Sequence, residues 1–121
     1  MTELKGKRFL LFGSEGYLGR HMAHFFTQQG AQIVPFDIHP ESKSRQQGYK
    51  QIDLTQPELL KDIDWNVDGV FMFSGLTGTG DSFTNYEKFQ AVNEGGLLNL
   101  LSAVKQSEYR PRIIFPSTRL V

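Results

Sequence analysis

Three glycines near the N-terminus have the spacing of a turn that binds phosphate groups. Gly13, Gly16 and Gly19 follow the apolar run 9–12 in a GxxGxxG pattern. Glycine there allows a sharp turn, a close approach of backbone to ligand, and tight packing of the next helix. The helix N-terminus would present free N–H groups and a partial positive charge to a pyrophosphate. The pattern therefore predicts a turn that binds a dinucleotide.

An acidic residue stands at the matching distance along the chain. Asp37 lies eighteen positions after Gly19, at the end of a predicted strand over residues 32–37. A carboxylate in this register accepts hydrogen bonds from the adenosine ribose hydroxyls, and it would repel the 2′-phosphate of NADP. Because no arginine immediately follows Asp37, the motifs together favour NAD as the cofactor. A solvated acid at a strand end is the simpler alternative.

The composition narrows the classes of protein. At 121 residues, the chain is long enough for one domain. Thirteen basic and thirteen acidic residues cancel without a basic run, which argues against nucleic acid as a partner. The absence of cysteine excludes disulfides and thiolate chemistry and suits a cytoplasmic location. No stretch has the length of a membrane span, and His21 and His24 lack a third ligand, so we expect neither a membrane nor a metal partner.

Strand and helix patterns alternate along the whole chain. This alternation predicts an α/β fold, a doubly wound parallel sheet (Rossmann fold) with about five strands in the order 3-2-1-4-5. Residues 39–48 are polar and predict an exposed connection. The predicted strands cover residues 7–12, 32–37, 49–54, 67–73 and 112–115, and the predicted helices cover residues 18–29, 55–63 and 84–105.

Three local features give sharper expectations. Pro35 cannot donate a ladder hydrogen bond, so we expect the pairing to be interrupted there or the strand to stop at residue 34. Thr55 with Glu58 has the spacing of a capping box, which predicts a helix start. Gly95 and Gly96 within the last helix each cost about 1 kcal/mol relative to alanine, which indicates close packing against another backbone.

With these residues in place, the sequence resembles the extended short-chain dehydrogenase/reductase superfamily, in its branch of NAD-dependent nucleotide-sugar epimerases and dehydratases. The match covers the whole chain. Residues 13–19 (GSEGYLG) are similar to the family's GxxGFIG turn, and residues 92–101 (VNEGGLLNLL) are similar to its VNxxGxxNLL helix. By this resemblance, the backbone amides of Tyr17 and Leu18 would face the pyrophosphate.

The resemblance also implies the other cofactor contacts. Asp53 and Leu54 correspond to a pair that contacts the adenine, although an aspartate before a helix is also ordinary turn chemistry. Residues 74–76 stand where the family has a small-residue loop beside the nicotinamide ribose. The implied cofactor-binding residues are Gly13, Gly16, Tyr17, Leu18, Gly19, Asp37, Ile38, Asp53, Leu54, Ser74, Gly75, Leu76 and Asn93.

Thr118 takes the place of the family's Ser or Thr that hydrogen-bonds the reacting sugar, which makes it the candidate catalytic residue. A plain strand-end threonine is the alternative. The family's Tyr-x-x-x-Lys base is absent, because Tyr86 and Tyr109 are not followed by lysine four residues later. The resemblance therefore implies a truncated NAD-binding domain, residues 1–121, of an epimerase or dehydratase that acts on a nucleotide sugar by transient hydride transfer. We expect this chain alone to be inactive.

Two further expectations concern regulation and assembly. A Rossmann fold alone does not imply catalysis, so a non-catalytic nucleotide-binding or regulatory module is the second hypothesis. We also expect a homodimer or larger assembly. The strand over residues 112–115 would leave an open sheet edge, and the related enzymes commonly dimerise through the helix that corresponds to residues 84–105.

Overall fold

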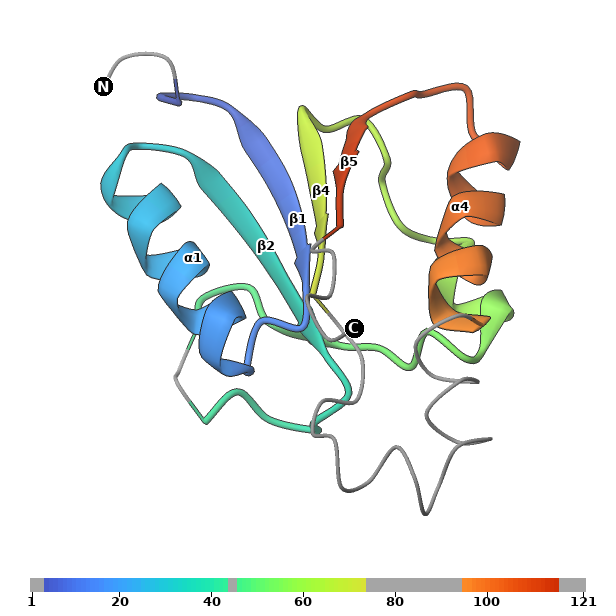
Figure 1. The fold of residues 1–121 in the computed structure, drawn as a ribbon, viewed down its shortest axis with the longest axis horizontal. Coiled ribbons are helices and arrows are strands. Elements are labelled where there is room, and N and C mark those ends of the chain that lie inside the picture. The colour runs from blue at the N-terminus through green and yellow to red at the C-terminus, as the bar shows by residue number, and fades with distance from the viewer. Residues whose placement is uncertain (1–3, 44–45, 74–94, 116–121) are drawn as a thin grey trace, which may run out of the picture.

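The computed structural model describes residues 4–43, 46–73 and 95–115, which form one sheet of five parallel strands. Across the sheet the order is β3-β2-β1-β4-β5, which confirms the predicted order. Figure 1 shows β2, β1, β4 and β5 in this order. The strands are β1 (Arg8–Phe12), β2 (Gln32–Asp37), β3 (Lys50–Gln51), β4 (Gly69–Met72) and β5 (Arg112–Ile114). The helices are α1 (Tyr17–Gln28), the short 3-10 helix η1 (Pro57–Leu60) and α4 (Gly96–Gln106).

The sheet separates two apolar layers, because α1 packs on one face and α4 on the other (Figure 1). Side chains of β1 alternate between the layers. Phe9 and Leu11 lie in the layer under α1, and Leu10 and Phe12 lie in the layer under α4. All four are buried, which explains why the apolar run of β1 is continuous. The end of β1 is thus held firmly where the glycine segment begins.

The expectation that Pro35 stops β2 or interrupts its pairing with β1 is wrong. Strand β2 continues to Asp37, and Pro35 is paired with Leu11 of β1. The N–H of Gln32 and the carbonyl of Phe36 both form hydrogen bonds on the β1 side of β2. Successive residues of a strand point their N–H groups to opposite sides, so the nitrogen of Pro35 points away from β1. On that side β3 begins only opposite Phe36. The missing N–H of Pro35 therefore costs no ladder hydrogen bond.

The segment after β3 differs most from expectation. The third strand is only Lys50–Gln51, because the chain turns at Asp53, whose carbonyl accepts a hydrogen bond from the amide of Gln56. The hydroxyl of Thr55 donates to Asp53 Oδ1 at 2.6 Å, and the residue at the helix start is Gln56, without a side-chain cap. The predicted capping box of Thr55 is therefore wrong, and the helix is the single turn η1.

Helix α4 matches the described part of the predicted last helix. Gly96 is closely packed, since a Cβ there would lie 3.2 Å from Leu54 Cβ. The close neighbour is a side chain, whereas the sequence predicted a backbone. No described atom lies within 4 Å of a Cβ added at Gly95, so the close packing expected for Gly95 stays a prediction. In the described part of the chain, no helix is long and apolar enough to cross a membrane.

Candidate dinucleotide site

The first part of the site is the glycine turn, residues 13–16, between β1 and α1. Gly13 has a φ of +92°, in the left-handed region that favours glycine. The amides of Gly13 and Ser14 both donate to the carbonyl of Phe36, at 2.8 and 3.0 Å. The turn is thus fastened to the end of β2, which also carries Asp37.

Gly19 and Gly16 have different reasons to be glycine. A Cβ on Gly19 would lie 2.0 Å from the carbonyl oxygen of Gly13, so only glycine lets α1 pack this closely on the turn. A Cβ on Gly16 would meet its nearest described neighbour, the same oxygen, at 3.5 Å, an ordinary contact. Packing within the described chain therefore accounts for Gly19 and leaves the space beside Gly16 open.

The start of α1 has the properties of an anion site. The first backbone bond of the helix runs from the amide of Arg20 to the carbonyl of Gly16, so the amides of Tyr17 and Leu18 have no acceptor within the helix. No acid lies in the first turn, and no side chain caps it. The side chains of Tyr17 and Leu18 are exposed. Nearby, the buried hydroxyl of Ser14 has no hydrogen-bond partner in the described part of the chain.

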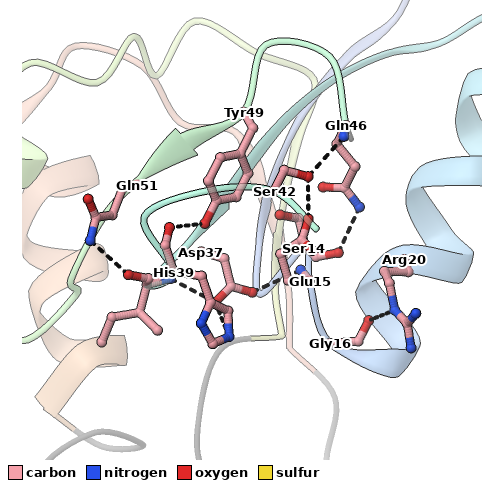
Figure 2. A network of polar contacts seen from close by, with 11 residues as sticks. Ser14, Glu15, Gly16, Arg20, Asp37, His39, Ser42, Gln46, Tyr49 and Gln51 are labelled. Carbon is pink, nitrogen blue, oxygen red and sulfur yellow. Dashed lines mark hydrogen bonds and ion pairs between the residues drawn. The ribbon is translucent and has the colours of Figure 1, made fainter. Parts of the chain in front are cut away.

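The structure brings Asp37 to the glycine turn, as the spacing predicted. Asp37 Oδ2 accepts a hydrogen bond from the amide of Glu15 at 2.9 Å, and Oδ1 accepts one from the amide of Ile38 at 2.7 Å (Figure 2). His39 Nε2 lies 4.0 Å from Oδ1. An ionised carboxylate offers about four lone-pair positions, so these bonds leave capacity for a ligand hydroxyl. The side chain is 13% exposed, which gives a ligand access to a mostly buried charge.

Sequence reasoning missed a set of contacts from the connection between β2 and β3. Ser42 Oγ donates to Glu15 Oε2 at 2.5 Å and accepts from the amide of Gln46 at 2.9 Å. Gln46 Nε2 donates to the carbonyl of Ser14 at 2.8 Å (Figure 2). Two polar residues in a polar connection carry no sequence signal of their acceptors. The expected exposed segment is thus bonded to the two central residues of the glycine turn.

Tyr49 holds the first part of the same connection. Its hydroxyl donates to the carbonyl of His39 (Figure 2). Burial, followed by the negative charges of Asp37 and Glu15, raises the pKa of Tyr49 to about 12. Tyr49 is therefore a neutral hydrogen-bond donor throughout the physiological range, beside two carboxylates.

Asp53 and Leu54 lie just beyond the end of β3, the neighbour of β2. Asp53 Oδ1 accepts from both the amide and the hydroxyl of Thr55, which is the ordinary turn role. The side chain of Leu54 is buried in the layer under α4, and its carbonyl accepts from Asn99 Nδ2 at 2.7 Å. Any contact of Leu54 with a ligand would thus involve its backbone. The role of this pair in adenine binding stays a prediction.

Several predicted site residues lie outside the described part of the chain. These are Ser74, Gly75, Leu76, Asn93 and the catalytic candidate Thr118. Within residues 4–43, 46–73 and 95–115, no three side chains of the metal-binding types lie close enough to share an ion.

An open hollow of about 990 Å³ lies along the free edge of β2, beside α1. Ile33 and Pro35 line it, together with Arg20 and His24. Neither Asp37 nor the glycines of the turn are among its lining residues. Ligands of parallel α/β sheets bind at the carboxyl ends of the strands, so we do not include this hollow in the site.

A parallel sheet in this order, with a glycine turn and an acidic residue at the carboxyl ends of adjacent strands, defines a Rossmann-type fold. The chain belongs to the NAD dependent epimerase/dehydratase family, whose family model matches residues 9–121.

Individual relatives agree with this assignment. UDP-glucose 4-epimerase of Streptomyces lividans is 26% identical over 120 residues, which cover 92% of this chain and 36% of that protein. The structure of L-threonine dehydrogenase from Phytophthora infestans is 27% identical with a TM-score of 0.78, over 92% of this chain and 36% of that one. The UDP-glucose 4-epimerase from Bifidobacterium longum, solved with NAD+ and UDP, shares the fold with a TM-score of 0.82 at 21% identity, over 93% and 37%. The chain spans about a third of the length of such relatives.

Proposed function

We propose that this chain binds NAD between the glycine turn, the start of α1 and Asp37, as the cofactor-binding part of an NAD-dependent epimerase or dehydratase. The observation that carries the proposal is the hydrogen bond from the Glu15 amide to Asp37 Oδ2. It joins the predicted ribose acid to the predicted pyrophosphate turn.

The glycine turn and the start of α1 fit a pyrophosphate in charge and in backbone geometry. The amides of Tyr17 and Leu18 would hold the pyrophosphate, with the positive end of α1 behind them. The absent side chain of Gly16 leaves room for the close approach. An anion near the turn would also give an acceptor to the hydroxyl of Ser14, which has no hydrogen-bond partner among the described residues.

Two carboxylates favour NAD over NADP. Asp37 would accept hydrogen bonds from the ribose hydroxyls, whereas a 2′-phosphate at the same place would bring like charges together. Glu15 lies close to Asp37, because its amide donates a hydrogen bond to Asp37 Oδ2. The negative charges of both residues also raise the pKa of Tyr49.

The proposed reaction concerns the whole enzyme. Bound NAD supplies a hydride acceptor and donor for transient oxidation of the substrate. Thr118 would orient a substrate hydroxyl, but a threonine cannot take its proton at neutral pH, so we expect no turnover from these 121 residues. The nucleotide-sugar substrate is proposed from the names of the epimerase relatives. An amino acid is the alternative substrate class, because L-threonine dehydrogenase is as similar to this chain in sequence as the epimerase is.

Calorimetric titration of the 121-residue chain with NAD and with NADP tests the cofactor assignment. We expect the chain to bind NAD more tightly than NADP. Asp37→Asn should lower the affinity for NAD and reduce the difference in affinity between the two cofactors. Asp62→Asn is the matched control, because Asp62 is an exposed acid after η1 and far along the chain from the turn. Equal binding of the two cofactors by the wild-type chain, or no binding of NAD, would overturn the proposal.

A further inference from the structure

The connection between β2 and β3 makes contacts that the cofactor proposal does not use. We infer that Ser42 and Gln46 are positioning residues for recognition of the adenosine ribose 2′-hydroxyl, an inference that rests on the proposed binding of NAD. The three hydrogen bonds that Ser42 and Gln46 make with Glu15, with Ser14 and with each other are called the clamp below.

The clamp acts on the two residues that set the shape of the glycine turn. Gln46 Nε2 holds the carbonyl of Ser14, whose own amide is bonded to β2 through Phe36. Ser42 Oγ holds the carboxylate of Glu15, whose amide is bonded to Asp37. Each central residue of the turn is therefore held on one side by β2 and on the other by the clamp (Figure 2).

This arrangement fixes the direction of the Asp37 carboxylate. Oδ2 accepts a hydrogen bond from the Glu15 amide, and Oδ1 accepts one from the Ile38 amide. The orientation of these two amides therefore determines the direction of the lone pairs that remain for a ligand. Release of Ser14 and Glu15 from the clamp would let the first of these amides turn. The Asp37 carboxylate would then meet a ribose hydroxyl in a range of orientations, and a hydrogen bond weakens steeply as its angle departs from linearity.

The test compares NAD with an analogue that lacks only the 2′-hydroxyl of the adenosine ribose. Gln46→Met keeps the length of the side chain and removes its hydrogen bond to Ser14. Ser42→Ala removes the hydroxyl, and Ser42→Thr restores it. Gln47→Ala is the matched control, because Gln47 is an exposed neighbour outside the clamp. Urea unfolding of each variant reports whether the fold is kept.

We expect the wild-type chain to prefer NAD over the analogue by roughly ten- to a hundredfold, the contribution of one hydrogen bond to a charged carboxylate. Gln46→Met and Ser42→Ala should reduce this preference toward one, and Ser42→Thr and Gln47→Ala should retain it. A merely structural role would lower the affinity for both ligands and leave their ratio unchanged. As a ligand-free readout, the Glu15 amide should exchange its hydrogen faster in Gln46→Met.

The outcomes separate the two proposals. If the wild-type chain binds no NAD, the proposed function fails, and this inference fails with it. In a second outcome, NAD binds, Asp37→Asn removes the preference for NAD over the 2′-deoxy analogue, and Gln46→Met and Ser42→Ala keep that preference. The proposed cofactor site is then supported, and the inferred role of the clamp is refuted.

Discussion

Gly19 and Gly16 should have different roles, because substitution of Gly19 should reduce the stability of the fold and substitution of Gly16 should reduce the affinity for NAD. In Gly19→Ala, the new Cβ would lie 2.0 Å from the Gly13 oxygen, 2.9 Å from its carbonyl carbon and 3.0 Å from Ser14 Cα. All three are backbone atoms, so no side chain can rotate away. Contact between carbon and oxygen requires more than 3 Å, so α1 must move by about 1 Å from the turn.

The cost can be placed on a scale. Overpacking in a well-packed site destabilises by about 1–3 kcal/mol, and this clash with fixed backbone belongs at or above the upper end. Gly16→Ala meets its nearest atom at 3.5 Å with a φ of −74°, which alanine adopts freely. Its effect on the free energy of unfolding should stay within about 1 kcal/mol, the cost of a poorer helix cap.

Urea unfolding and calorimetric titration with NAD measure the two effects. Gly19→Ala should lose about 3 kcal/mol of the free energy of unfolding or fail to fold. Gly16→Ala should fold like the wild type and bind NAD at least tenfold more weakly, because its methyl group occupies the space beside the pyrophosphate. A stable Gly19→Ala would refute the packing argument, and tight NAD binding by Gly16→Ala would refute the proposed position of the cofactor.

Three further outcomes follow from the structure. Gly95→Ala should change the free energy of unfolding by less than about 1 kcal/mol, because Gly95 is the N-cap of α4 and already has helical φ and ψ. Gly96→Ala should lose stability, because its Cβ would lie 3.2 Å from Leu54 Cβ; urea unfolding measures both. Tyr49 favours its protonated form in the fold, so its contribution is complete below pH 10 and is lost as the pH rises through about 12; in unfolding measurements Tyr49→Phe should abolish this loss. Leu98 and Leu101 are both exposed on α4, and β5 is an edge strand of the described sheet, so light scattering at tens of micromolar should show a dimer or larger species, and a monomer would contradict this.

Elements that repeat a pattern over several residues could be predicted from the sequence. The burial of β1 on both faces of the sheet needs four consecutive apolar residues, and α1 needs apolar residues at helical spacing, so both patterns are long enough to recognise in the sequence. Segments that depend on one or two residues were less certain. Thr55 has the spacing of a cap, but its hydroxyl bonds Asp53, two residues earlier, and this choice between acceptors depends on the turn at Asp53.

The candidate site divides in the same way. The placement of Gly13, Gly19 and Asp37 together could be predicted, because it follows from backbone geometry that the spacing fixes. The contacts of Ser42 and Gln46 could not be predicted, because their acceptors are more than 25 residues away in the chain and come near only after folding. A polar side chain in a connection gives no indication of which carbonyl or carboxylate it will meet.

The pairing of β2 with β1 links both parts of the site. Because Leu11 pairs with Pro35 and Phe12 with Phe36, the chain leaves β1 at Gly13 where β2 ends in Asp37. The Phe36 carbonyl can then accept both amides of the turn, while Asp37 accepts the next one from Glu15. A shift of one residue would reverse the face on which the Asp37 side chain lies. The register is held by the pair Leu10–Val34, in which Val34 is partly buried, and by the buried pair Phe12–Phe36. The rings of Phe12 and Phe36 stack with their centroids 4.6 Å apart. The apolar core under α4 therefore determines where the Asp37 carboxylate lies.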